Sequence, residues 1–279
     1  MQETAGRPML DLSHYLQEWE LTDPQPLAKT ATSTVYTVTY QGERVVLKLL
    51  TPIGVDDEQS GAVALDYWNG SGSVKLLRHG AIAHLLEYAE GDNLTAMVER
   101  GDDEQAAEII ADVLNQLHAV RSPIPNGLWL LERRFQSLFE RASLYPDTIF
   151  ARAAVVARRL LDDPRDVRVL HGDMHHYNVR QSARGWLAYD PKGVVGERAF
   201  DAANTLCNPD GVPDLLRSET RLLRNAEILA RGMGVDLGRL LAFTFAYACL
   251  SAAWTLEGVS GDAGLALAVA ENAERYITS

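Results

Sequence analysis

The chain has 279 residues, of which 47% are hydrophobic and 23% are charged, as in an ordinary soluble globular protein. Its 38 acidic and 26 basic residues give a formal net charge of −12 at pH 7, which repels phosphate backbones and anionic lipid surfaces. Nucleic acids and membranes are therefore not expected as partners, whereas a cationic small molecule would be attracted.

The first structured part of the chain reads as a β-hairpin. Residues 33–40 and 44–50 are two β-prone runs, and Gln41-Gly42 between them has the composition of a tight turn. The pattern predicts antiparallel strands.

A helix and two further strands are expected next. Residues 56–68 begin with acidic residues, carry apolar residues at helical spacing and stop at Asn69-Gly70, which predicts a helix. Residues 74–77 and 84–88 then complete a small sheet, and a turn at residues 90–92 ends the strand-rich part.

Beyond that turn the apolar residues recur mostly at intervals of three and four, which predicts helices. The expected helices are residues 102–120, 131–142, 150–161, 215–233, 237–256 and 263–276. Strands first and helices after them indicate an α+β protein with a small antiparallel-sheet lobe and a large helical lobe.

The residues most indicative of chemistry lie in a turn-rich block between these helices. Asp173 precedes Asn178 by five residues, the spacing of a kinase catalytic loop in which the Asp accepts a hydroxyl proton and the Asn binds a metal ion. Asp190 follows the apolar stretch 186–189, which could return the chain to the same cleft as a hairpin does. Asn178 and Asp190 could then converge on Mg²⁺, which prefers oxygen ligands.

Simpler interpretations exist for the same block. A single His-Gly-Asp is a common turn, so only the joint pattern predicts phosphoryl transfer. His171, His175 and His176 could also suggest a zinc hydrolase, although the turn composition argues against the helical spacing that such a site needs.

Four segments resemble the aminoglycoside phosphotransferase family of kinase-like enzymes, especially its streptomycin 6-kinase and hydroxyurea kinase branch. The likeness covers most of the chain and lies in LLEYA (85–89), HGDMHHYN (171–178), GWLAYDPKGVVGE (185–197) and AYACLSAAW (246–254). The resemblance implies a bilobal protein-kinase-like fold, with residues 1–89 as the nucleotide-binding lobe and residues 90–279 as the helical lobe.

The resemblance also implies roles for individual residues. Asp173 would be the catalytic base, and Asn178 and Asp190 would bind the metal. His171 and Asp201 would support the catalytic loop. The hinge, residues 86–89, would hydrogen-bond adenine, which places Glu87, Tyr88 and Ala89 at the nucleotide.

A lysine inside an apolar strand supports the same interpretation. Lys48 interrupts the run 45–50, which is costly unless its ammonium has an anionic partner. ATP phosphates and Glu58, on the sheet-facing side of the next helix, could supply that partner. A solvated Lys48 with Glu58 as an ordinary first-turn acid is the alternative.

The sequence departs from protein kinases in two ways. The loop 29–34 contains no glycine, so phosphate binding would fall to Ser33 and Thr34. DPK (190–192) replaces DFG, and no long activation loop follows it, which removes the platform for a protein substrate. A small-molecule acceptor is therefore expected.

These observations predict an ATP- or GTP-dependent, Mg²⁺-requiring O-phosphotransferase that acts on a small hydroxyl compound. By resemblance the acceptor is streptomycin or a similar guanidinium-bearing aminoglycoside, and the activity would confer antibiotic resistance. Hydroxyurea, an amino sugar, or a nucleotide-binding pseudokinase without transfer are the alternatives. The candidate acceptor contacts are Asp210, Asp214, Trp254 and Glu257.

A cytoplasmic location is also expected. Cys207 and Cys249 lie in no CxxC or metal-ligand spacing, which fits a reducing compartment. Residues 1–20 lack the apolar core of a signal peptide. The longest apolar run, residues 240–256, contains several polar residues and is expected to be a buried helix rather than a membrane span.

Overall fold

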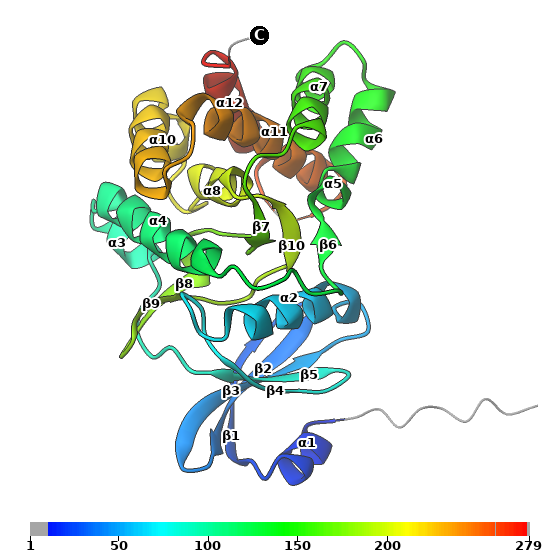
Figure 1. Cartoon of the computed structure of the whole chain (residues 1–279), viewed down its shortest axis with the longest axis vertical. Coiled ribbons are helices and arrows are strands. Elements are labelled where there is room, and N and C mark those ends of the chain that lie inside the picture. The colour runs from blue at the N-terminus through cyan, green and yellow to red at the C-terminus, as the bar shows by residue number, and fades with distance from the viewer. Residues whose placement is uncertain (1–10, 260, 278–279) are drawn as a thin grey trace, which may run out of the picture.

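A five-stranded antiparallel sheet forms the smaller of two lobes in the computed structural model, which describes residues 11–259 and 261–277 (Figure 1). The strand order is β1-β2-β3-β5-β4. The strands are β1 (Thr22–Lys29), β2 (Ser33–Tyr40), β3 (Glu43–Leu50), β4 (Leu76–His79) and β5 (Ala83–Glu87). The first ten residues of the expected N-terminal lobe lie outside the described residues.

The hairpin β2–β3 closes through the turn that the sequence predicts. Gln41 and Gly42 have φ angles of 52° and 84°, and Tyr40 pairs with Glu43 across the turn. A two-residue turn with both φ angles positive matches the right-handed twist of the strands, and glycine adopts such angles without strain.

The two faces of this sheet pack into different hydrophobic cores. On one face Leu85 packs with Tyr15 and Trp19, at the end of α1 (Leu12–Glu18). On the other face Leu86 joins the main core together with residues of α2 (Val55–Trp68), the helix that lies across the sheet in Figure 1. The alternation of side chains along β5 thus ties α2 and the inner sheet face to the helical lobe.

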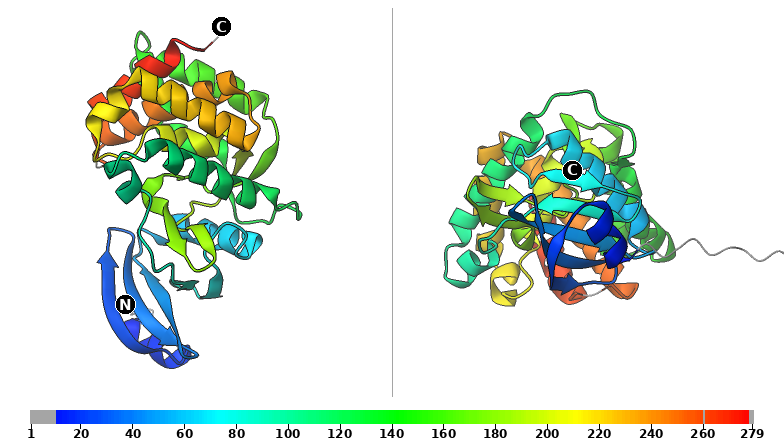
Figure 2. Two further views of the ribbon diagram at one scale, coloured as in Figure 1. Left: turned by 90° about the vertical axis from the view of Figure 1, so that its left-hand side faces the viewer. Right: turned by 90° about the horizontal axis from the view of Figure 1, so that it is seen from below.

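The larger lobe is mostly helical, as expected from the sequence (Figures 1 and 2). Its helices are α3 (Thr95–Glu99), α4 (Asp103–Ala119), α5 (Leu131–Arg134), α6 (Gln136–Leu144), α7 (Ile149–Asp162), α8 (Ala199–Leu206), α9 (Pro213–Arg217), α10 (Glu219–Met233), α11 (Leu237–Leu256) and α12 (Ala263–Glu274). The expected helix 215–233 is divided at Ser218, whose hydroxyl accepts a hydrogen bond from the Arg221 amide and starts α10.

Helix α11 forms the centre of the helical lobe and packs against α7, α8 and α12. It is long and apolar enough to cross a membrane by length and composition, but its most apolar stretch is 72% buried inside the protein. This burial is that of a core helix, as the polar residues within the run suggested.

Two small sheets between the lobes hold the turn-rich block. Strands β6 (Trp129–Leu130), β10 (Val194–Glu197) and β7 (Val167–Leu170) form one sheet. Strands β8 (Val179–Ser182) and β9 (Gly185–Ala188) form an antiparallel hairpin after a single 3₁₀ turn (His176–Asn178). The loops at the ends of these strands carry the candidate catalytic residues, because Asp173 follows β7 and Asp190 follows β9.

Candidate active site

The carboxylate of Asp173 lies in the loop that follows β7. Asn204 Nδ2 donates to its Oδ1 at 2.9 Å, and His175 Nε2 lies 3.7 Å from its Oδ2. Burial alone would raise the pKa of Asp173, but the nearby His175 ring and the Lys192 charge hold it well below its usual range. The side chain is still 24% exposed, so an ionised carboxylate is accessible to a small molecule.

The loop around Asp173 is held in place by a buried acid from α8. Asp201 accepts hydrogen bonds from the backbone amides of His171, at 2.8 Å, and Gly172, at 2.7 Å. The same carboxylate lies 2.9 Å from His118 Nε2. His171 Nδ1 accepts from the Asp173 amide while its Nε2 donates to the Tyr189 carbonyl, as a neutral ring can, and burial lowers the pKa of His171. Both supporting residues lie where the sequence predicted them.

Asn178 and Asp190 flank the hairpin β8–β9 and therefore come close together. Val179 pairs with Ala188, and the Tyr189 amide donates to the Asn178 carbonyl at 3.0 Å. Asn178 Nδ2 donates to the Asp173 carbonyl at 2.9 Å, which fixes the orientation of the Asn178 amide. Asp190 has a φ of 61°, a conformation that non-glycine residues adopt mainly where surrounding structure demands it.

Lys48 lies between two carboxylates from distant parts of the chain. Its Nζ is 2.5 Å from Glu58 Oε2 of α2 and also contacts Asp190 Oδ1. The Lys48 and Glu58 side chains are 10% and 5% exposed, so this is a buried ion pair. The expected pairing of Lys48 with Glu58 is confirmed, and Lys48 joins the sheet lobe to the end of the β8–β9 hairpin.

A cavity of about 490 Å³ opens between the sheet and this hairpin, and we call it the interlobe cavity. Lys48, Asn178 and Asp190 line it, as does the entire expected hinge, residues 86–89. The Glu87 carboxylate points into an ion pair with Arg184, with N···O distances of 2.6 and 2.8 Å. Glu87 can therefore meet a ligand in this cavity mainly through its backbone.

The loop before β2 contributes to the same cavity, with one correction to the expected residues. Ser33 lines the cavity, but Thr34 does not, because successive side chains of a strand point to opposite faces. Thr30 and Thr32, which sequence reasoning missed, line it instead. Thr30 Oγ1 accepts a hydrogen bond from the Ser33 amide at 3.0 Å, which makes this loop a tight polar turn without glycine.

A second cavity, of about 550 Å³, lies on the other side of the Asp190 loop, and we call it the helical-lobe cavity. Its lining is Trp129, Arg133, Arg134, Gln136, Ser137, Glu140, Lys192, Trp254 and Val259. The Arg133 guanidinium lies 3.2 Å from the Trp129 ring centre, and that of Arg134 lies 4.8 Å from the Trp254 ring centre. Three cations and one carboxylate thus surround this cavity.

Only one of the four expected acceptor contacts lies on the helical-lobe cavity. Trp254 lines it, whereas Asp210, Asp214 and Glu257 are exposed and do not. The three acids therefore lie outside this cavity, whose charged and aromatic lining consists of arginine, lysine, glutamate and tryptophan. Lys192 was visible in the DPK motif, but no local signal marks Arg133, Arg134 or Trp129, because helix packing and not sequence proximity brings them to the site.

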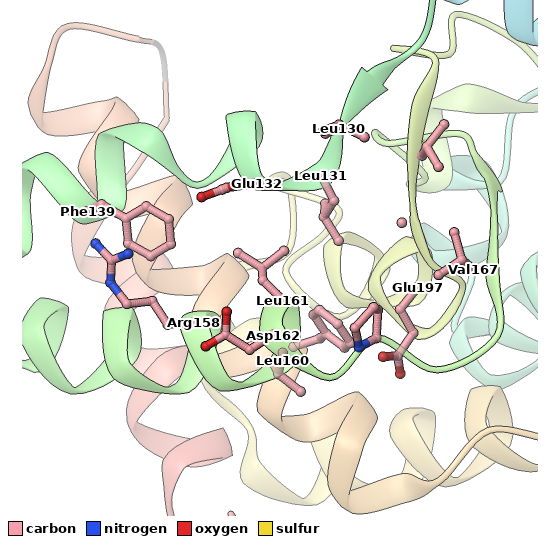
Figure 3. A pocket seen from close by; sticks show the side chains of 14 residues that line it. Leu130, Leu131, Glu132, Phe139, Arg158, Leu160, Leu161, Asp162, Val167 and Glu197 are labelled. Atoms are coloured by element: carbon pink, nitrogen blue, oxygen red, sulfur yellow. The ribbon is translucent and has the colours of Figure 1, made fainter. Parts of the chain in front are cut away.

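A third cavity, of about 270 Å³, lies in the helical lobe between α5, α6, α7 and β10 (Figure 3). Phe139 and Arg158 lie at one end and Val167 and Glu197 at the other, as Figure 3 shows. Glu197 binds the Arg239 guanidinium, with N···O distances of 2.6 and 2.8 Å, so its charge serves the packing of α11.

The described residues contain no group of three or more His, Cys, Asp or Glu side chains placed to hold a metal ion. His171, His175 and His176 therefore do not form the zinc site that their spacing could suggest. Asn178 and Asp190 both carry side-chain oxygens and both line the interlobe cavity. Such a pair fits an ion that takes its other ligands from phosphate oxygens and water, as Mg²⁺ does.

Comparisons with known proteins agree on the family. A family model described as aminoglycoside/hydroxyurea antibiotic resistance kinase matches residues 18–258. The streptomycin 3''-kinase of Klebsiella pneumoniae is 37% identical over 92% of this chain and 97% of that protein. The streptomycin 6-kinase of Streptomyces griseus is 31% identical over 96% of this chain and 89% of that protein. The hydroxyurea phosphotransferase of Kitasatospora aureofaciens is 33% identical over 73% of this chain and 64% of that protein.

Solved structures with low sequence identity share the fold. Choline kinase LicA from Streptococcus pneumoniae has a TM-score of 0.63 at 15% identity and covers 95% of this chain and 96% of its own. A thermostable mutant of aminoglycoside phosphotransferase APH(4)-Ia, in a ternary complex with ADP and hygromycin B, has a TM-score of 0.62 at 13% identity with the same coverage. The two-lobed kinase-like architecture expected from the sequence is thereby confirmed.

Proposed function

Since this chain belongs to the aminoglycoside/hydroxyurea antibiotic resistance kinase family, we propose that it transfers the γ-phosphoryl group of ATP to a hydroxyl of a small molecule held in the helical-lobe cavity. The observation that carries the proposal is the position of Asp190. Its Oδ1 contacts Lys48, which lines the interlobe cavity, and its Oδ2 lies 3.4 Å from Lys192 Nζ, which lines the helical-lobe cavity.

The interlobe cavity is the proposed nucleotide site. Adenine would meet the hinge backbone at Glu87, Tyr88 and Ala89, and the phosphates would meet Lys48 and the polar turn that includes Ser33. Mg²⁺ held by Asn178 and Asp190 would neutralise charge on the phosphate oxygens. In this assignment residues up to 89 form the nucleotide-binding lobe, and the acceptor site lies in the helical lobe.

Asp173 is the proposed base of the transfer. It accepts the proton of the acceptor hydroxyl as that oxygen bonds to the γ-phosphorus, while the bond from phosphorus to the ADP oxygen breaks. The depressed pKa of Asp173 keeps the carboxylate ionised at neutral pH. Asp201, His171 and Asn204 hold the base in place rather than touching the reactants.

The proposed acceptor is streptomycin or a similar aminoglycoside, because streptomycin kinases match this chain over nearly its whole length. Phosphorylation would then confer resistance, and it would take place in the cytoplasm, where ATP is available and free cysteines such as Cys207 and Cys249 stay reduced. The tryptophan faces of the helical-lobe cavity offer surfaces on which a guanidinium can stack, as Arg133 and Arg134 now do.

One observation favours hydroxyurea as a second candidate acceptor. Arg133, Arg134 and Lys192 place three cations around the helical-lobe cavity, which disfavours a polycation and leaves an uncharged molecule unaffected. A hydroxyurea phosphotransferase is among the relatives of this chain.

The test is an ADP-release assay on the purified protein with MgATP and, separately, streptomycin, hydroxyurea and an amino sugar. The proposal expects acceptor-dependent ADP release, a product heavier by one phosphoryl group, and loss of both when Mg²⁺ is chelated. Binding of MgADP without transfer to any acceptor would instead identify a pseudokinase. The product's phosphorylated hydroxyl, read by NMR, separates 3''- from 6-phosphorylation of streptomycin.

A further inference from the structure

Lys192 occupies the boundary between the two cavities that the proposed reaction connects. Its side chain lines the helical-lobe cavity, and its Nζ lies 3.4 Å from Asp190 Oδ2. The other oxygen of Asp190 contacts Lys48 on the interlobe side. Two lysines that line different cavities therefore contact the two oxygens of the same carboxylate.

Hydrogen bonds hold both backbone polar groups of Lys192. Its amide donates to the His171 carbonyl at 2.7 Å, and its carbonyl accepts from Ser60 Oγ of α2 at 2.8 Å. Gly193, with a φ of 59°, lets the loop lie so close to α2 that an added Cβ would come within 1.9 Å of the Ser60 carbonyl oxygen. The Lys192 side chain is only 22% exposed.

The other cations of the helical-lobe cavity are engaged differently. Arg133 and Arg134 lie over the rings of Trp129 and Trp254. Lys192 reaches a carboxylate at the junction of the cavities instead. Its ammonium carries three donors on a flexible stem, so it can follow a moving anionic group over a short path.

We propose that Lys192 is a further catalytic residue, whose ammonium contacts the oxygens of the phosphoryl group while that group passes from the nucleotide to the acceptor. This inference rests on the proposed phosphotransferase function. In the transition state the phosphoryl group carries negative charge spread over its oxygens. A cation beside those oxygens lowers the activation free energy of the transfer. Lys192 keeps all its protons: the bond to ADP breaks, the bond to the acceptor oxygen forms, and the hydroxyl proton goes to Asp173.

The first test replaces Lys192 by methionine, which keeps the apolar stem and removes the ammonium. Lys192→Met should lower kcat by about 10²- to 10³-fold, the usual effect of losing one donor aimed at developing charge. The Kd for MgADP and the Tm should stay near those of the wild-type protein. Arg231→Met, which removes an exposed cation from α10, is the matched control and should leave kcat unchanged.

A second test reads the same contact without turnover. MgADP with aluminium fluoride mimics the transition state of phosphoryl transfer. The wild-type protein should therefore bind this complex more tightly than MgADP alone, and calorimetry measures the two affinities. Lys192→Met should lose most of that gain. Equal gains in both proteins, or no gain in the wild-type protein, would overturn the inference. A wild-type gain that depends on Lys192 supports it even if no acceptor is phosphorylated, in which case only the proposed function fails.

Chemical rescue separates charge from packing. Lys192→Cys treated with 2-bromoethylamine carries a lysine-like ammonium, and the same variant treated with iodoacetamide carries an uncharged chain. Both native thiols are buried, and burial raises the pKa of Cys207 to about 12, so alkylation should be confined to position 192. Only the aminoethylated protein should regain kcat; equal recovery after both treatments would show that Lys192 acts through packing.

Discussion

The interlobe cavity and the helical-lobe cavity meet at Asp190 but differ in how their charges are balanced. In the interlobe cavity Lys48 is buried against Glu58 and Asp190, so its charges are paired within the protein. In the helical-lobe cavity Arg133 and Arg134 lie over tryptophan rings, so cations outnumber carboxylates. Ion pairs within the protein hold the side chains of the interlobe cavity in place until a ligand such as MgATP replaces one member of a pair. Arginines held by aromatic faces and, for Arg134, by a hydrogen bond to the Gly172 carbonyl leave room for acceptors of different shape.

Asp173 lies close enough to Asp190 and Lys192 for its charge to shift the pKa values of both, and we expect the largest effect there. Asp173→Asn retains an oxygen for the hydrogen bond from Asn204 but cannot accept the hydroxyl proton, so kcat should fall by roughly 10²- to 10⁴-fold. The Kd for MgADP should change little, because Asp173 does not line the interlobe cavity. Steady-state kinetics and calorimetry measure the two effects; near-normal turnover would remove Asp173 from the role of base.

Removing Lys48 takes away the cation that Glu58 and Asp190 share. Lys48→Met leaves the Glu58 carboxylate buried without a cationic partner and should lower the free energy of unfolding by about 3–5 kcal/mol, the usual cost of breaking a buried ion pair. The double variant Lys48→Met/Glu58→Gln should recover much of that stability while turnover stays low. Urea unfolding and kinetics provide the measurements.

The exposed pair of Arg152 with Glu274 is the control for that experiment. Arg152→Met should cost little, since its guanidinium is largely solvated. Full turnover in the double variant would show that Lys48 is needed for folding and not for the nucleotide.

The helical-lobe cavity should respond in KM for the acceptor and not in KM for ATP. Trp254→Leu removes an aromatic face that can hold a guanidinium, a contact of about 0.5–2 kcal/mol, so the KM for streptomycin should rise between about twofold and thirtyfold. Tyr145→Leu, at an exposed aromatic residue outside the cavity, should change neither constant. A rise confined to the KM for ATP would mean that the two cavities have been assigned the wrong way round.

The smallest effect is expected from the acids that the sequence suggested as acceptor contacts. Asp210→Asn, Asp214→Asn and Glu257→Gln together should change the KM for streptomycin by no more than about twofold, because exposed charges contribute little. A much larger rise in that KM would show that these acids bind the acceptor. It would also contradict the assignment of the acceptor to the helical-lobe cavity.

The features of this protein that could be predicted from the sequence are those with a local signal. The family, the kinase-like fold and the phosphotransferase activity are confirmed by the relatives of the chain. The hairpin turn at Gln41-Gly42 and the pairing of Lys48 with Glu58 are seen in the structure. The roles of Asp173, Asn178 and Asp190 stay predictions, although the structure brings all three to one place.

Elements with a weak local pattern were missed. Strand β1 contains Pro24 and Pro26 and is mostly exposed, so it lacks both the alternation and the β-prone residues that mark a strand. It is an edge strand that forms because β2 offers it hydrogen bonds. Helix α1 is short, and only its packing against the outer sheet face reveals it.

The sequence by itself determined much of the interlobe cavity, because Asn178, Asp190 and the expected hinge lie in short motifs whose spacing dictates where the side chains go. Asn178 and Asp190 converge because the strands between them form a hairpin. Tertiary structure decided most of the helical-lobe cavity, although Trp254 and Lys192 lie in segments that the sequence singled out. Trp129 and Trp254 are 125 residues apart and come to one cavity only when α11 packs into the helical lobe. The charge of that cavity depends on which side chains this packing turns inward, which neither the net charge of −12 nor any local motif specifies.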